Sequence, residues 1–474
     1  MLFNSFEFLA FLPIALLGAK FLSGKARRIW LVILSYIFYG WATPWHCLLL
    51  VASTVLDFNI GRRMHATSDS VRRRRLLVAS LCGNLGLLAA FKYSGMAAVA
   101  MNDLLAALGA GYEMAIPAIL LPVGISFYTF QTLSYTIDVY RGNMKAEESF
   151  STFALYVAFF PQLVAGPIER ATHLLPQLKE KRRVSSQDQL SGWCRILWGL
   201  VKKVVFADWL AFYVDQIFAL EGFGGPWAFL LAMNAFAFQI YLDFSAYSDI
   251  AIGLARLLGV NLRENFQWPY MSRSISDFWR RWHISLSTWL RDYLYIPLGG
   301  SRGGKAKTLR NFFIVMFLGG LWHGAAYTYI LWGLWIGLAL ALHVLLKPFL
   351  SRGPLGAIPD PVMRVSGILL TYTIMLGAWV FFRAADLDQA LAGFRVLGSD
   401  WGTVTFGPDP ETSLRAGIAL GVAVLAHILR GSGLAHPKIA HASAFRLSLF
   451  FGGSIILIAL FHAPEGSRFL YFQF

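Results

Sequence analysis

The chain has 474 residues, of which 57% are hydrophobic and only 14% are charged, whereas soluble domains carry about 45 to 50% and about 25% respectively. It contains 39 Phe, 18 Tyr and 16 Trp and lacks the polar residues that a water-exposed surface requires, which excludes a soluble enzyme. Apolar runs recur from residue 3 to residue 462 without a polar block long enough to fold alone. We therefore expect a single membrane-embedded domain over residues 1–474.

The net charge of the chain is +15. Its basic residues cluster between apolar runs, as they do in the cytoplasmic loops of membrane proteins. We therefore expect a membrane, and no nucleic acid, as a partner. Cys47, Cys82 and Cys194 are widely separated and form no CxxC pair, so we expect neither a disulfide framework nor a metal site.

A spanning helix needs about 20 mainly apolar residues. The candidate spans are residues 3–22, 30–60, 76–100, 115–137, 151–166, 193–219, 226–258, 312–346, 363–382, 412–429 and 446–462. Thr43 and Pro44, flanked by two tryptophans, turn the second stretch into a hairpin of two short spans. Basic residues before and after this hairpin place both of its ends inside and the N-terminus of the chain outside. We predict an all-α, polytopic membrane protein with about eleven or twelve transmembrane helices.

Proline and glycine interrupt several of these runs. Broken helices at membrane depth are tolerated where the backbone lines a cavity or is covered by protein, and ordinary kinks are the alternative. The interrupting residues are Pro117, Pro122, Gly124, Pro161, Gly166, Pro167, Gly319, Gly320 and Gly324.

Residues 270–310 form the one sizeable polar segment, with eight basic and two acidic residues and therefore a net charge of +6. Residues 275–290 within it keep apolar side chains at helical spacing. We therefore expect a helix that lies at the cytoplasmic interface or re-enters the membrane.

His323 is the most informative single residue. It lies thirteen residues beyond the basic edge at Arg310, which at about 1.5 Å per residue places it roughly 20 Å into the bilayer, near its midplane. The run to Leu346 is too long for one straight span and must tilt or break. An ionisable side chain at this depth is a functional candidate, and a neutral imidazole accepts a proton from a hydroxyl, as a general base does. A buried histidine that bonds to a carbonyl is the alternative.

His283 is the second candidate, and the neighbouring Arg280, Arg281 and Arg291 present guanidinium groups that could bind a phosphorylated ligand such as coenzyme A. Anchoring at the cytoplasmic face is the alternative for these arginines. His343 and His427 lie near the ends of their spans, so we assign them interfacial or packing roles.

Asp243 and Asp249 are intramembrane carboxylates six residues apart. They could orient a histidine, bind a hydroxylated substrate or pair with a buried arginine, and we favour the arginine.

The order of several motifs resembles the membrane-bound O-acyltransferase family, most closely its bacterial branch that acts in the O-acetylation of polysaccharides such as alginate. The resemblance covers nearly the whole chain. Its motifs are Pro122–Phe127, Phe160–Ile168, Asp243–Asp249, Asn265-Phe266 with Pro269-Tyr270, Phe278–Ser287, Arg291–Tyr293, Tyr295–Gly300, Leu321–Gly324 and the closing Tyr471–Phe474. Ala246 stands where relatives often have glycine.

The resemblance implies a ring of tilted helices around a central tunnel that reaches an essential histidine, with interfacial or re-entrant helices. This histidine corresponds to His323, and the family's second, less uniform active-site position corresponds to His283. We group Trp322, the neighbour of His323, with Asp243, Asp249 and the three arginines as substrate-binding residues.

The resemblance further implies an inner-membrane acetyltransferase that takes an acetyl group from cytoplasmic acetyl-CoA, used as a co-substrate, toward an extracytoplasmic polysaccharide. The N-terminus would then be periplasmic, and a periplasmic transferase of the SGNH type or another polysaccharide-modifying protein would be a partner. A transporter or flippase without acyl chemistry, and a lipid or protein acyltransferase of the same family, are the alternatives.

Overall fold

The computed structural model describes residues 1–117, 119–180, 182–351, 359–402, 404–407, 409–432, 443–463 and 469–470. These residues form helices and no strand, which confirms the all-α prediction. The chain divides into two compact units, Met1–Ile196 with Ile250–Arg263, and Leu197–Asp249 with Glu264–Phe474. The motif Tyr471–Phe474 lies outside the described residues.

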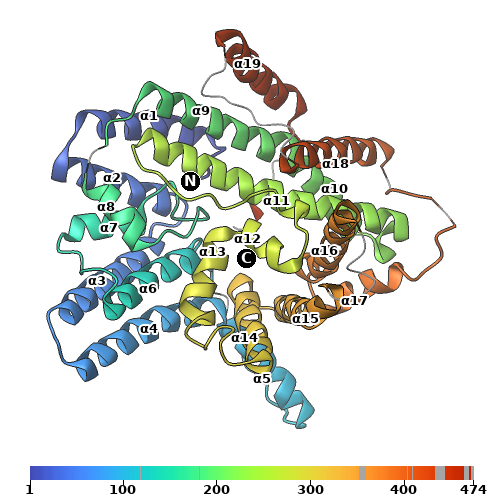
Figure 1. Cartoon of the computed structure of the whole chain (residues 1–474), viewed down its shortest axis with the longest axis horizontal. Coiled ribbons are helices and arrows are strands. Elements are labelled where there is room, and N and C mark those ends of the chain that lie inside the picture. Colours follow the sequence, from blue (N-terminus) through green and yellow to red (C-terminus); the bar gives the residue numbers. More distant parts are fainter. Residues whose placement is uncertain are drawn as a thin grey trace. The chain divides into compact units, whose positions relative to one another are not determined.

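The first unit is built mainly from helices of the N-terminal part of the chain, drawn from blue to green in Figure 1. Polar side chains cap several of them: Ser5, Asp69 and Ser149 accept hydrogen bonds from the first backbone N–H groups of α1, α4 and α7, which otherwise have no partner within the helix. The helices are α1 (Phe6–Phe21), α2 (Gly24–Gly40), α3 (His46–His65), α4 (Ser70–Lys92), α5 (Ser94–Ala107), α6 (Ile125–Arg141), α7 (Phe150–Ala158), α8 (Ala171–Lys179) and α9 (Ser186–Val201), which continues into the second unit at Leu197.

The second unit carries all of the expected site residues. The long α11 begins in it and continues into the first unit at Ile250. Its elements are the π-helical turn η1 (Lys202–Ala207), α10 (Asp208–Phe218), η2 (Glu221–Gly224), α11 (Pro226–Leu257), η3 (Pro269–Met271), α12 (Ile275–Arg281), α13 (Ile284–Leu290), a second π-helical turn η4 (Arg291–Tyr295), α14 (Lys305–His323), α15 (Tyr327–Ser351), α16 (Asp360–Arg383), α17 (Leu387–Val396), α18 (Pro410–Gly431) and α19 (Ala444–Phe461).

Six of the described helices are long and apolar enough to cross a membrane, namely α4, α11, α15, α16, α18 and α19. They support a polytopic membrane protein. The predicted hairpin in residues 30–60 is confirmed, since α2 ends at Gly40 and α3 begins at His46.

Three predicted helices are wrong in their extent. Of residues 151–166, only those up to Ala158 are helical, and turns follow around Pro161. Residues 115–137 do not form one helix, because the described residues before Ile125 are irregular and contain Pro117 and Pro122. Residues 275–290 form two short helices instead of one, because Trp282 is extended and His283 has a left-handed backbone with φ of 41°. The spacing of apolar residues in that segment indicates a buried face. It cannot indicate a break in the helix at a single residue with a left-handed backbone.

The long run through His323 breaks as expected. α14 ends at His323, Gly324 is extended, and α15 begins at Tyr327. The two helices pack closely through glycines: a Cβ on Gly320 would overlap the carbonyl oxygen of Tyr329, and one on Gly333 would overlap that of Met316. Close backbone approach of this kind is typical of membrane helices with small residues at their interface.

We predict that Gly320→Ala lowers the stability of the protein, because its new methyl group must displace backbone and not a flexible side chain. Overpacking of this kind costs about 1 to 3 kcal/mol. Gly417→Ala in α18 is the matched control, since nothing lies within 4 Å of its added Cβ and alanine favours a helix over glycine. Thermal unfolding in detergent, followed by size-exclusion chromatography, should show a lower midpoint for Gly320→Ala alone. Equal midpoints would contradict the packing argument.

Candidate active site

His323 ends α14 inside an enclosure of aromatic rings. Only 4% of the residue is exposed. Its imidazole centroid lies 4.9 Å from the ring of Trp332 in α15 and 5.3 Å from that of Phe382 in α16, and 4.9 Å from that of the preceding Trp322. Rings contributed by three helices therefore surround the imidazole with apolar surface, which excludes water and strengthens any hydrogen bond formed there.

His283 lies between α12 and α13 and is fully buried. Its ring meets Phe244 of α11 edge-on, with centroids 4.7 Å apart, and also contacts Trp322 at 5.9 Å. Because Trp322 contacts His323 as well, one indole touches both histidine rings. The two histidines are forty residues apart in sequence, and the fold brings both to the same tryptophan.

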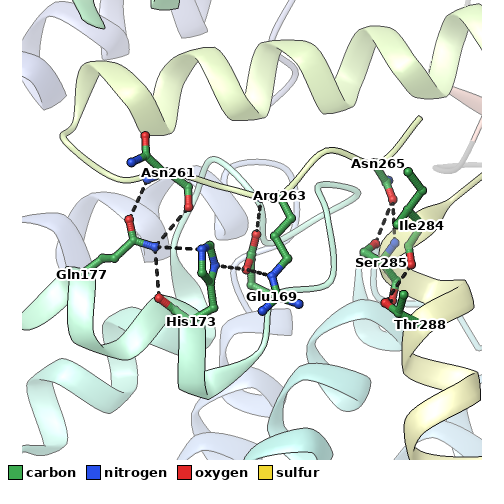
Figure 2. Close-up of polar contacts among 9 residues, drawn as sticks. All are labelled: Glu169, His173, Gln177, Asn261, Arg263, Asn265, Ile284, Ser285 and Thr288. Carbon is green, nitrogen blue, oxygen red and sulfur yellow. Dashed lines mark hydrogen bonds and ion pairs between the residues drawn. The ribbon is translucent and has the colours of Figure 1, made fainter. Parts of the chain in front are cut away.

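Asn265 organises the backbone and the ring of His283. Its Oδ1 accepts hydrogen bonds from the backbone N–H of Ser285 at 3.2 Å and from the Ser285 hydroxyl at 2.9 Å, and Figure 2 shows the two side chains facing each other. The same oxygen lies 3.2 Å from Nδ1 of His283, while Nδ2 donates to Ser248 of α11 at 3.2 Å.

These contacts determine which nitrogen of His283 carries the proton. The donors of Ser285 identify the contacting atom of Asn265 as the oxygen, which only accepts, so Nδ1 of His283 must donate to it. Nε2 is then the basic nitrogen. His283 lies outside the six apolar helices, and its burial lowers the pKa of its imidazole to about 3, so the ring is neutral at pH 7.

In the first unit, a separate polar cluster holds the segment that follows α11. The buried carboxylate of Glu169 accepts from the backbone N–H of Arg263 at 2.7 Å and contacts Nδ1 of His173 at 2.7 Å. Gln177 bonds to both the N–H and the carbonyl of Asn261, at 2.8 and 3.1 Å. Figure 2 shows these side chains gathered against the segment that contains Asn261 and Arg263. This segment is not helical, so the side chains supply hydrogen-bond partners that its backbone would otherwise lack.

The three arginines expected to bind the donor lie near the surface of the second unit. Arg280 is exposed. Arg281 pairs with Asp277 at 3.2 Å, and Arg291 pairs with Asp292 at 2.7 Å with 59% of its side chain exposed. Exposed guanidinium groups remain able to exchange such partners for phosphate.

Asp243 and Asp249 pair with buried lysines. The expected arginine partner is wrong for Asp243, whereas Asp249 also interacts electrostatically with Arg430. Nζ of Lys203 lies 2.8 Å from Asp243 and 2.8 Å from Asp208, and Nζ of Lys202 lies 2.6 Å from Asp249. Both lysines belong to the π-helical turn η1. A π-helical turn widens the helix by one residue and is frequent at functional sites. This turn lets two consecutive lysines bury their amino groups in the same unit.

The end of the described chain completes this ionic cluster. The backbone N–H of Leu470 donates to Oδ2 of Asp243 at 2.6 Å, and the ring of Phe469 lies 4.6 Å from Nζ of Lys203. Both oxygens of Asp243 are therefore engaged by the protein, which favours a structural role over contact with a substrate.

Sequence reasoning missed Lys202, Lys203 and Asn265. The two lysines lie within a predicted span, where an ionisable residue indicates a functional role. The sequence therefore contained a signal that could have identified them. Asn265 belongs to a recognised motif, but its contact with His283, eighteen residues away, depends on the fold.

Comparisons with known proteins place the chain among related sequences. A model of the membrane-bound O-acyltransferase family matches residues 146–381. The "Probable alginate O-acetylase AlgI" of Pseudomonas aeruginosa is 42% identical, over 90% of this chain and 80% of that protein, and that of Azotobacter vinelandii is 38% identical over the full length of both. The "Peptidoglycan O-acetyltransferase" of Helicobacter pylori is 35% identical, over 82% of this chain and 78% of that protein.

We predict that Lys203→Met strongly destabilises the protein, because it leaves Asp208 and Asp243 buried without their shared cation. Removing one partner of a buried ion pair costs about 3 to 5 kcal/mol. Arg415→Met is the control, since it breaks a pair with Glu411 that is largely exposed and worth less than about 1 kcal/mol. Thermal unfolding in detergent should show a much larger fall in the midpoint for Lys203→Met than for Arg415→Met. Equal falls would show that the buried ion pair contributes no more to stability than the exposed one.

We also predict that Asn265 sets the tautomer of His283. In protein labelled with ¹⁵N-histidine, the NMR shifts of His283 should report a protonated Nδ1, with His283→Asn identifying the signal. Asn265→Leu removes the acceptor, so the signal should move toward a tautomer mixture or the Nε2–H form. A protonated Nε2 in the unmodified protein would refute the assignment.

Proposed function

Because the chain belongs to the membrane-bound O-acyltransferase family, we propose that this O-acyltransferase moves an acetyl group from acetyl-CoA at the cytoplasmic face toward an extracytoplasmic polysaccharide such as alginate. The observation that carries the proposal is the position of His323, a buried imidazole at a helix break inside an aromatic enclosure. The names of the alginate and peptidoglycan relatives support acetyl as the acyl group and a polysaccharide as the eventual acceptor.

In this proposal His323 provides the base. Its neutral imidazole takes the proton of the acceptor hydroxyl while the hydroxyl oxygen attacks the thioester carbonyl, or it carries the acyl group covalently to the acceptor. Both routes need an imidazole held in a dry site, which the rings of Trp322, Trp332 and Phe382 support.

His283 is the second catalytic residue of the proposal. Its contact with the Trp322 indole, which also touches His323, supports a place beside the reacting groups. Trp322 would then line the substrate site between the two imidazoles. Asn265, which holds the ring through Nδ1, leaves Nε2 as its basic nitrogen.

The donor side of the proposal rests on charge. The segment 270–310 carries a net charge of +6, and basic segments of this kind face the cytoplasm, where coenzyme A thioesters occur. Exposed Arg280 and Arg291 would attract the phosphates of acetyl-CoA, with Arg281 beside them. No metal ion is required, and Asp243 and Asp249 would keep the lysine cluster in place.

We further propose that the whole chain acts as one domain of about eleven spans around a tunnel, in the inner membrane with its N-terminus in the periplasm. An acetyl group delivered at the outer face has to reach a sugar hydroxyl. A periplasmic SGNH-type transferase or another polysaccharide-modifying protein would complete that step.

We predict that His323→Ala abolishes thioester turnover, because no other imidazole contacts the same three rings among the described residues. The measurement follows label release or transfer from isotope-labelled acetyl-CoA by purified protein in nanodiscs. His343→Ala is the matched control, a half-buried histidine on α15 that should retain activity. Removing a catalytic base should lower the rate at least about 100-fold.

Equal turnover by His323→Ala and the unmodified protein would contradict the assignment of His323. Palmitoyl-CoA supplied in parallel tests the donor: faster turnover of the long chain would favour a lipid or protein acyltransferase over an acetyltransferase.

A further inference from the structure

Two tryptophans near His323 carry buried N–H groups that lack an acceptor. Within the described residues, the indole Nε1 atoms of Trp332 and Trp279 are shielded from solvent and have no hydrogen-bond partner. Trp332 is 2% exposed. A buried donor without a partner costs about 1 to 3 kcal/mol, so each such group in a folded protein requires an explanation.

Several other tryptophans of this unit have a hydrogen-bond acceptor for the indole N–H. Trp335, one turn further along α15, donates to the carbonyl of Ile374 at 2.9 Å. Trp209 and Trp227 donate to the carbonyls of Phe461 and Trp401 at 2.9 and 3.1 Å. The fold therefore satisfies several indoles of this unit. The N–H of Trp379 also lacks a hydrogen-bond partner among the described residues, but it faces the hydroxyl of Tyr270 and not a site beside His323.

The position of the two indoles connects them with the reaction. The ring of Trp332 contacts that of His323 at 4.9 Å and that of Trp279 at 5.9 Å. Its other neighbours, Phe382 and Trp379, are also aromatic. Among these four rings, only the imidazole has an acceptor nitrogen, and the Trp332 N–H does not bond to it. A ligand bound beside His323 is therefore the natural source of an acceptor.

We propose that the N–H groups of Trp332 and Trp279 bind the carbonyl oxygen of the acyl group and stabilise the negative charge that forms on it during transfer. The inference rests on the proposed function of His323. The proposed function names a base but no hydrogen-bond donor for the thioester carbonyl oxygen. The two indole N–H groups would supply such donors. Donors already in place inside a dry site stabilise such charge far better than water does.

The step balances as follows. The acceptor oxygen forms a bond to the carbonyl carbon and gives its proton to His323, while the π electron pair of the carbonyl moves onto the oxygen held by the two indoles. The tetrahedral intermediate then collapses: the C=O bond reforms, the C–S bond breaks, and the thiolate leaves with the proton from His323. No redox partner or metal takes part.

The experiment replaces the tryptophan N–H with sulfur and changes little else. Benzothienylalanine, incorporated at position 332 by a reassigned codon, keeps the shape of the indole but has no N–H donor. We expect kcat for acetyl-CoA turnover to fall at least about tenfold, toward the 100-fold or greater loss known for oxyanion donors, with KM within about twofold. The same replacement at position 279 should lower kcat in the same direction.

Benzothienylalanine at position 335 is the matched control. It removes an N–H that bonds to a backbone carbonyl, so it should lower the unfolding midpoint while leaving kcat near that of the unmodified protein. The variant at position 332 loses no bond within the protein, so its midpoint should be unchanged or raised. Trp332→Phe provides a second form without the donor if codon reassignment yields little protein.

The outcomes separate this inference from the proposed function. Turnover by the unmodified protein with unchanged kcat at position 332 would overturn the indole assignment and leave His323 as the base. A rise in KM alone would also overturn it, because it would assign the N–H to ground-state binding. If neither the unmodified protein nor His323→Ala turns over acetyl-CoA, the result would count against the proposed function. It would then also count against a carbonyl-binding site at Trp332.

Discussion

The close approach of α14 and α15 is the constraint on which the candidate site depends. The two helices touch through backbone at Gly320 and Gly333, so their spacing leaves no room for a side chain to adjust. The break at Gly324 then places His323 at the end of one helix and Trp332 in the second turn of the other. The distance between imidazole and indole is thus a property of the main chain, which is far stiffer than a pair of packed side chains.

α11 supports both halves of the site from a single element. Asp243 binds Lys203, and five residues further on Ser248 accepts the bond from Asn265, the residue that holds His283. Because charges buried in a membrane protein are stable only when they are paired, the lysines of the π-helical turn η1 and the aspartates of α11 depend on each other. α11 therefore carries both the partner of Lys203 and the hydroxyl that supports Asn265.

Sequence alone predicted the helical class, the hairpin in residues 30–60 and the break near His323, because length, apolarity and glycine placement are local signals. It also proposed His323 and His283 as site residues, through burial and motif resemblance, and the fold brings both rings into contact with Trp322. It did not predict the lysine partners of Asp243 and Asp249, since a sequence gives no distance between residues forty apart. It missed the division of residues 275–290, because a left-handed residue other than glycine has no clear sequence signature.

The left-handed backbone at His283 limits what evolution and design can place there. At a φ of 41°, β-branched residues are strongly disfavoured, whereas asparagine, aspartate and glycine adopt this conformation readily. An asparagine would fit both the backbone and the neighbouring amide of Asn265. The position is therefore open to replacement by a few polar residues of different acidity, and the side chain that contacts Trp322 can change while α12 and α13 keep their junction.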